Sequence, residues 1–205
     1  IIVGNVVGED ALAAVGASTA ITMLFVMVAM GTGIGCSVVI SQLFGAKQLE
    51  KMKTAISTAL LSILGISVFL SLLGVVINRG LMRLMGTPEN IFADAAEYMQ
   101  IYFFGFAFLF LYNAFSAIFN ALGDSRKPLL FLMFSSLLNI ALDLYFVAEL
   151  HMGVPGVAWA TLIAQALSAV LSFFFLMRKL GKIETEKFAR FDMELLLTMV
   201  KVAIP

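Results

Sequence analysis

Long apolar runs separated by short polar segments dominate this chain. Five of them cover roughly residues 17–43, 54–77, 97–121, 128–148 and 155–177. Each run is at least as long as the roughly 20 residues that an α-helix needs to cross a bilayer. The runs are too long for strands, and they lack the alternation of a membrane β-barrel. The pattern therefore predicts an all-α membrane protein with five complete transmembrane helices.

Shorter apolar segments flank these five runs. Residues 1–8 are predicted to end a helix that begins upstream, and an amphipathic segment from Leu195 is predicted to begin another helix. Because the chain begins at Ile1 and ends at Pro205 inside an apolar run, we expect it to be an excerpt of a longer protein. The segment LMRLMG (81–86) is predicted to form a short helix along the outer membrane surface.

Composition supports this membrane assignment. Hydrophobic residues make up 61% of the chain and charged residues 13%, against roughly 25% charged in soluble domains. The formal net charge is zero, so nothing indicates a nucleic-acid partner. A single cysteine excludes an internal disulfide and a cysteine-based metal site. No nucleophile–base pair or metal-ligand spacing occurs, so we expect neither an enzyme nor a soluble cofactor.

The charged residues indicate how the helices are oriented. Eleven of the thirteen Lys and Arg residues lie in or just beyond GAKQLEKMK, GDSRKP and RKLGKIETEKFAR, and these connections alternate along the chain with acidic or neutral ones. The positive-inside rule places the basic connections in the cytoplasm. We expect a multi-pass protein of the prokaryotic cytoplasmic (inner) membrane, with the lipid bilayer as its first partner.

Asp143 is the only charged residue away from the ends of the predicted spans. A carboxylate inside a bilayer costs several kcal/mol unless it is paired, hydrated or protonated. Asn139 lies one helical turn before it, and Thr161 lies at a similar depth on the next helix, roughly 7–9 Å below the outer end. Gln165 continues the Thr161 face one turn deeper. These oxygens suit a proton, Na+ or an organic cation, whereas the alternative is a hydrogen-bonded cluster that only joins two helices.

Other polar and small residues give weaker signals. Asn113, Ser116 and Asn120 on one helix either line a transport path or pair with neighbouring helices. Gly31, Gly33 and Gly35 resemble a phosphate-binding loop only as a string of letters, and close helix packing explains them better. The aromatic residues Tyr98, Tyr102, Tyr145 and Trp159 fall near the predicted outer interfaces, where an aromatic belt is expected.

Several stretches together resemble one transporter family. They are IIVGNVVGEDALAAVGAST, GTGIGCSVVISQLFGAKQLEK, FNALGDSRKP, SSLLNIALDLYFV, GVPGVAWATLIAQ and KVAIP. In this order and with these loop lengths, they are similar to the amino-terminal half of a multidrug and toxic compound extrusion (MATE) transporter. The resemblance implies one six-helix lobe of a twelve-helix protein, with the first helix incomplete. Residues 1–194 would form this lobe, and residues 195–205 would begin helix seven of the second lobe.

The resemblance also implies a function. Family members export drugs or organic cations in exchange for Na+ or H+, and a second transmembrane lobe of the same full-length chain would complete the cleft. In members that couple through the amino-terminal lobe, helix five carries an Asn and an Asp one turn apart, which match Asn139 and Asp143, and helix six carries a Thr that matches Thr161. Gln165, Asn113 and Ser116 are the expected substrate-cavity residues. The family site also uses an Asp on the first helix, at a position before Ile1. The resemblance leaves both Na+ and H+ as possible coupling ions.

Two other functions compete with antiport. The first is a flippase for lipid-linked oligosaccharides from the same superfamily, whose anionic substrate would favour Arg or Lys facing the cavity. No basic residue lies within a complete span, which counts against it. The second is a non-transporting helix bundle or a channel. Asp143 beside an amide and a hydroxyl fits an exchange site better than a continuous pore.

Overall fold

A computed structural model describes residues 9–185 and 187–203 of the chain, and all its regular elements in that part are helical. The helices follow one another as α2 (Glu9–Gly45), α3 (Leu49–Leu84), α4 (Glu89–Phe104), α5 (Phe106–Ala121), α6 (Arg126–Asp143), a π-helical turn η1 (Leu144–Glu149), α7 (Gly153–Gly181) and α8 (Met193–Ala203).

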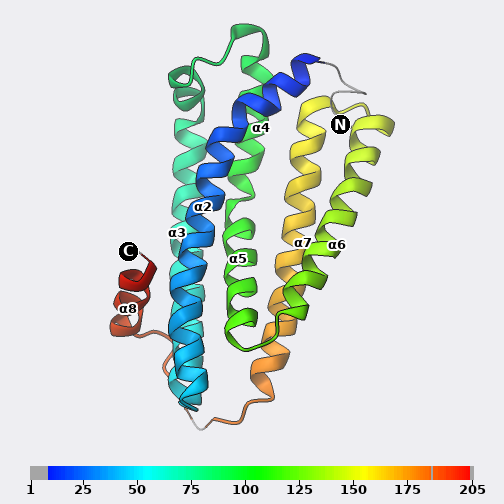
Figure 1. Ribbon diagram of the computed structural model, residues 1–205. Helices are drawn as coiled ribbons and strands as arrows, with labels where there is room; N and C mark the ends of the chain where they lie inside the picture. Colours follow the sequence, from blue (N-terminus) through cyan, green and yellow to red (C-terminus); the bar gives the residue numbers. More distant parts are fainter. Residues whose placement is uncertain (1–8, 186, 204–205) are drawn as a thin grey trace.

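The helices form one elongated bundle in which α5 is central (Figure 1). This helix packs against α2, α3 and α7, whereas α6 lies at the edge of the bundle and packs mainly on α7. The short helix α8 returns to pack on α2 and α3. Because α6 buries only Phe131 among its residues, most of its surface faces lipid or another part of the protein.

The described residues contain four helices that are long and apolar enough to cross a membrane, at Ile21–Gly45, Leu49–Leu84, Arg126–Glu149 and Gly153–Gly181. The pair α4 and α5 forms a fifth span if the two helices are counted as one. The prediction of five complete spans therefore holds, with the third span broken into two helices. Residues 1–8, predicted to end an earlier helix, lie outside the described residues.

Gly105 separates α4 from α5, and the two helices meet at an angle of 49°. The sequence analysis predicted one uninterrupted helix over 97–121. At the break, the Gly105 N–H donates to the carbonyls of Ile101 and Tyr102, so the turn tightens. A Cβ at Gly105 would lie 3.3 Å from the Tyr102 carbonyl oxygen and 3.4 Å from Cγ of Leu162 on α7. The bend thus lets α4–α5 approach α7 closely at this depth.

The predicted interfacial helix at 81–86 is wrong. Residues 81–84 continue α3, which ends at Leu84, and the chain turns at Gly86 with φ +68°. The predicted span ends at residue 77, directly before the polar Asn78. Instead Asn78 is buried, and its Nδ2 donates to the Ala96 carbonyl of α4 at 2.6 Å. This hydrogen bond lets the helix continue through a polar position.

Small residues set how closely the helices approach. A Cβ at Gly33 would lie 3.3 Å from Cβ of Ala117 on α5, and one at Gly35 would lie 2.5 Å from the Met199 carbonyl oxygen on α8. Gly31 has nothing within 4 Å of such a Cβ. The close-packing interpretation of these glycines is therefore confirmed for Gly33 and Gly35 and wrong for Gly31.

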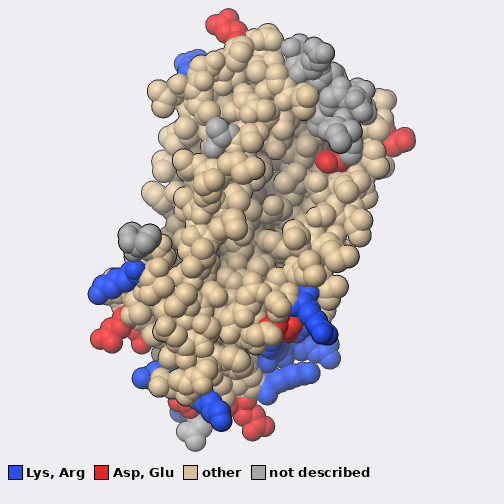
Figure 2. Space-filling model, in the orientation of Figure 1, with Lys and Arg blue, Asp and Glu red and all other residues tan. Residues whose placement is uncertain are grey.

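On the face shown in Figure 2, most charged side chains lie toward the two ends of the bundle, and a further group lies at its side near α8. Most of the Lys and Arg residues lie at the end that carries the α2–α3 turn, the α5–α6 turn and the α7–α8 linker. The positive-inside rule places this end in the cytoplasm.

Asp124 links two elements at this basic end. Its Oδ2 lies 3.0 Å from Lys127 Nζ and 3.1 Å from Lys179 Nζ, so the α5–α6 turn is tied to the end of α7. Partial burial raises the pKa of the Asp124 carboxyl, but the hydrogen bonds from Lys127 and Lys179 outweigh this effect and lower the pKa below its ordinary value.

Because the folded-state pKa is lowered, the Asp124 ion pairs stabilise the fold above the unfolded-state pKa and lose this effect as the pH falls through the folded-state value. We expect Asp124→Asn to reduce the free energy of unfolding at neutral pH by up to about 1 kcal/mol, the range for solvent-accessible pairs. Thermal unfolding of the detergent-solubilised protein measures this loss of stability. The difference from wild type should disappear once the pH falls below the lowered folded-state pKa. A difference that persists when Asp124 is fully protonated would contradict the ion-pair origin.

Candidate functional site

Asp143 is the last residue of α6 and lies directly before the π-helical turn η1. The side chain is half-buried between α6 and its neighbours. In this turn the Leu150 N–H donates to the Tyr145 carbonyl at 3.0 Å, one residue further back than in an α-helix. Such turns shift the helical register and occur often at functional sites. The backbone beyond Asp143 therefore differs from a regular transmembrane helix.

Asn139 and Thr161 meet across the α6–α7 contact. The Asn139 Nδ2 donates to Thr161 Oγ1 at 3.3 Å, and both side chains are half-buried. Both also line a cavity of about 200 Å³ together with Gln165, Ser135 and Ser136. The structure thus brings together three of the predicted site residues, Asn139, Thr161 and Gln165. Because Asn139 uses its nitrogen for Thr161, its Oδ1 remains as an oxygen that can face a ligand.

Two buried oxygens at this site have no hydrogen-bond partner within the described residues. They are Oδ1 of Asp143 and Oε1 of Gln165. Buried polar atoms are nearly always paired with protein, water or an ion, so each of these oxygens calls for a further partner. Asp143 lies one turn from Asn139 on the same face of α6. Carboxylate, amide and hydroxyl oxygens together can bind a hard cation, or the carboxylate alone can accept a proton.

Tyr98 and Tyr102 lie near this site, and the sequence analysis did not assign them to it. Tyr98 on α4 is only 8% exposed and lies within electrostatic range of Asp143. The rings of Tyr98 and Tyr102 stack with their centroids 6.1 Å apart, and Tyr102 contacts a small cavity that Thr161 and Gln165 also line. The aromatic-belt interpretation is wrong for Tyr98, because the packing of α4 within the bundle buries it.

Asn113 and Ser116 line a different cavity. It measures about 300 Å³ and lies between α2 and α5, where Gly33 and Ser37 also border it. The Asn113 Nδ2 donates to the Leu109 carbonyl of its own helix at 2.8 Å. The structure therefore separates the predicted substrate-cavity residues into two groups, with Gln165 beside Asn139 and Thr161, and Asn113 and Ser116 on the α2 side of α5.

Among the residues that the structure describes, no charged side chain lines either of these two cavities. Their walls combine amide and hydroxyl groups with leucine, methionine, alanine and other apolar side chains. The Asp143 carboxylate lies one helical turn from Asn139, which lines the α6–α7 cavity. The electrostatics of this region favour a cation over an anion.

Comparison with known proteins adds independent information. The family model named MatE matches residues 1–145 of this chain. The "Probable multidrug resistance protein YoeA" of Bacillus subtilis (strain 168) is 31% identical over 99% of this chain and 46% of its own length. The "FAD transporter" of Shewanella oneidensis is 26% identical over 88% of this chain and 41% of its own length.

Solved structures resemble the whole bundle. A protein described as "MATE in the bent conformation" superposes with a TM-score of 0.88 and 26% identity, over 99% of this chain and 46% of its own. The chain thus spans about half the length of the relatives that it matches. The order and packing of the described helices are those of the amino-terminal half of these structures.

Proposed function

Because this chain belongs to the MatE family of multidrug transporters, we propose that it forms the amino-terminal half of an antiporter that exports drugs or organic cations from the cytoplasm in exchange for Na+ or H+. Members of this family are transporters rather than enzymes. The observation that carries the proposal is the Oδ1 atom of Asp143, which has no hydrogen-bond partner within the described residues and lies one helical turn from the Asn139–Thr161 pair.

In this proposal Asp143 is the coupling residue. Its carboxylate binds Na+ or a proton, and Oδ1 gains the partner that it lacks among the described residues. Asn139 Oδ1 and Thr161 Oγ1 lie on the adjoining surfaces of α6 and α7 and add oxygen ligands when the ion is Na+. Ion binding at the α6–α7 contact changes the packing of these two helices. Drug and ion then bias the same inward–outward equilibrium in opposite directions, and the coupling is reciprocal.

The lining of the cavities supports a cationic or neutral substrate. One relative is named as a transporter of FAD, whose phosphates are anionic, so relatives of this chain differ in the charge of what they carry. An anionic substrate, including the pyrophosphate of a lipid-linked oligosaccharide, would be bound by Arg or Lys. Among the described residues, the linings of the α6–α7 and α2–α5 cavities contain neither, and they combine amide and hydroxyl groups with small and aliphatic side chains.

A transport assay tests this proposal. The complete protein encoded by the gene is reconstituted in liposomes loaded with a fluorescent cationic dye, and a Na+ gradient or a pH gradient is imposed separately. We expect one of the two gradients to accelerate dye movement, and its collapse with an ionophore to abolish the acceleration. A rate of dye movement that is the same with and without each gradient would refute antiport. Transport only of an anionic or lipid-linked substrate would favour a flippase.

A further inference from the structure

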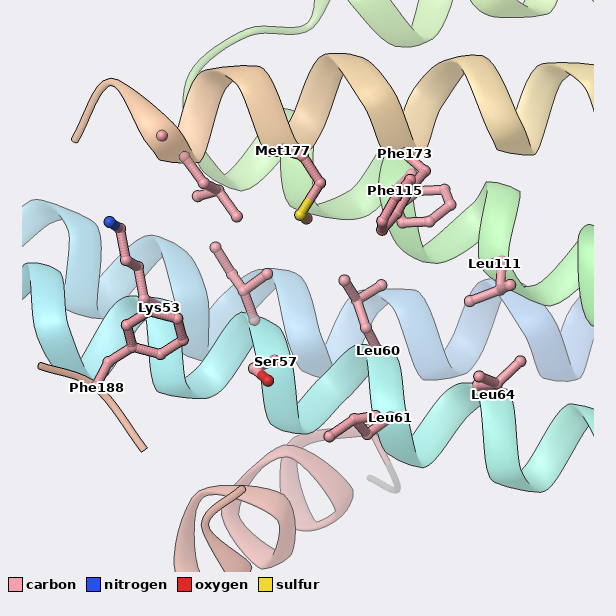
Figure 3. Close-up of a pocket in the computed structure, with 13 residues that line it drawn as sticks. Lys53, Ser57, Leu60, Leu61, Leu64, Leu111, Phe115, Phe173, Met177 and Phe188 are labelled. Carbon is pink, nitrogen blue, oxygen red and sulfur yellow. The ribbon is translucent and has the colours of Figure 1, made fainter. Parts of the chain in front are cut away.

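A larger cavity lies away from the candidate site, between α3, α5 and α7. Its volume is about 520 Å³, within the roughly 300–1,000 Å³ typical of ligand pockets. Side chains of α3 and α7 point toward one another across it (Figure 3). None of the predicted coupling or substrate residues lines this cavity. Its wall is mainly leucine and phenylalanine, with Lys53 and Ser57 as its polar side chains.

This groove runs from the basic end of the bundle into the membrane. Lys53 lies one turn inside α3, and Leu64 lies eleven residues further along the same helix. At 1.5 Å per residue the groove extends about 16 Å, which is close to half of the roughly 30 Å hydrocarbon core. The hydroxyl of Ser57 donates to the Arg190 carbonyl at 2.6 Å. The walls beyond Lys53 are therefore apolar over the depth of one leaflet.

Lys53 forms a cationic mouth at the cytoplasmic end of this groove. Its Nζ donates to the Ile183 carbonyl at 2.6 Å and lies 5.7 Å from the centroid of the Phe188 ring. No carboxylate pairs with it in the part of the chain that the structure covers. An ammonium group has three N–H donors, so Lys53 can also bind an anion. Lys182 and Lys187 adjoin the lining residues Gly181 and Phe188 in sequence and add positive charge. Two described carboxylates lie near this end of the groove, Glu50 in the first turn of α3 and Glu184 in the linker, so the three lysines outnumber them.

We propose that this groove binds an anionic glycerophospholipid of the cytoplasmic leaflet, with one acyl chain along Leu60, Leu64 and Phe115 and the phosphate at Lys53. Basic pockets between transmembrane helices at the cytoplasmic side bind anionic headgroups. A cationic drug is disfavoured by the positive mouth. The expected start of the second lobe, α8, packs on α2 and α3 and not across the groove between α3 and α7.

A bound lipid would also contact the α7–α8 linker. The linker is held on α3 by Lys53 and Ser57 through the two carbonyl contacts above, and by Thr58, whose Oγ1 accepts from the Asp192 N–H at 2.9 Å. Lys53 therefore belongs both to the mouth of the groove and to the attachment of the linker. The phosphate of the anionic lipid joins the Lys53 ammonium and the Ile183 carbonyl in one contact, and it strengthens the hold of the linker on α3.

Native mass spectrometry of the complete, delipidated protein tests the site. The protein is titrated with phosphatidylglycerol or with phosphatidylcholine of the same acyl chains, and bound lipid is counted. We expect phosphatidylglycerol to bind more tightly, and Lys53→Gln to weaken it about fivefold, the effect of one surface-proximal cation, while phosphatidylcholine binding stays unchanged. Lys51→Gln is the matched control, because Lys51 is exposed on the same helix and does not line the groove.

A second pair of variants tests the acyl-chain position. Leu64→Trp places bulk at the inner end of the groove and should lower binding of both lipids, whereas Leu72→Trp, on an exposed face of α3 outside the groove, should leave binding unchanged. The proposal is overturned if both lipids bind wild type equally, or if neither Lys53→Gln nor Leu64→Trp lowers phosphatidylglycerol binding.

Discussion

Replacing Asp143 with asparagine is expected to reduce ion-driven export by at least about tenfold, within the usual range of coupling between two sites. The amide keeps the shape of the side chain and one acceptor oxygen, but its NH2 group donates, it carries no charge and it does not titrate. It therefore cannot take up a proton or neutralise Na+ at the oxygen that lacks a partner among the described residues. The measurement is gradient-driven dye transport by the complete protein in liposomes, with wild type and variant reconstituted at equal density.

Asp124→Asn is the matched control for this substitution. Asp124 lies in the α5–α6 turn, where it pairs with Lys127 and Lys179, and it contacts neither candidate cavity. We expect this variant to transport at the wild-type rate. The binding affinity for the dye separates coupling from folding, because Asp143→Asn should still bind dye while losing the response to the gradient. Full ion-driven export by Asp143→Asn would make Asp143 a structural residue and refute its coupling role.

The spans were predictable because each crossing needs a long apolar run, whatever the tertiary contacts. The bend at Gly105 was not, since a glycine within an apolar run occurs in straight and bent helices alike. Here Leu162 of α7 packs against Gly105, and the Ser71 hydroxyl of α3 donates to the Phe103 carbonyl at 2.6 Å, which are contacts between helices that only the fold brings together. The end of α3 was predicted too early for a related reason. The buried hydrogen bond from Asn78 to α4, which lets α3 continue, is a tertiary contact.

The candidate site was predictable only in part. Asp143 stood out because a charge inside a span is rare, and helical spacing placed Asn139 on its face. Pairing of Asn139 with Thr161 followed from the short connection between two antiparallel helices. Tyr98 belongs to a helix far away in sequence, and no periodicity within α4 indicates which neighbours cover it. Lys53 was likewise interpreted as a loop charge, because the groove behind it needs three helices that only the fold brings together.

Replacing Gly74 with alanine is expected to destabilise the fold by about 1–3 kcal/mol, the usual effect of overpacking a core. Gly74 is a buried residue of α3, and an added Cβ would lie 2.7 Å from Cγ of Phe103 on α4. The Phe103 ring cannot withdraw easily, because it is fully buried and packs against Phe106 and Phe25 with centroid distances of 5.0 and 5.9 Å. The midpoint of thermal unfolding in detergent measures the effect.

Gly65→Ala is the matched control, since Gly65 lies on the same helix and a Cβ added there would have nothing within 4 Å. Alanine has a higher helix propensity than glycine, so this variant should keep or slightly raise the unfolding midpoint. The clash with the Phe103 ring also predicts rescue, because Phe103→Leu combined with Gly74→Ala should recover part of the loss. Equal midpoints for Gly65→Ala and Gly74→Ala would show that α3 and α4 do not pack at Gly74 as the structure has them.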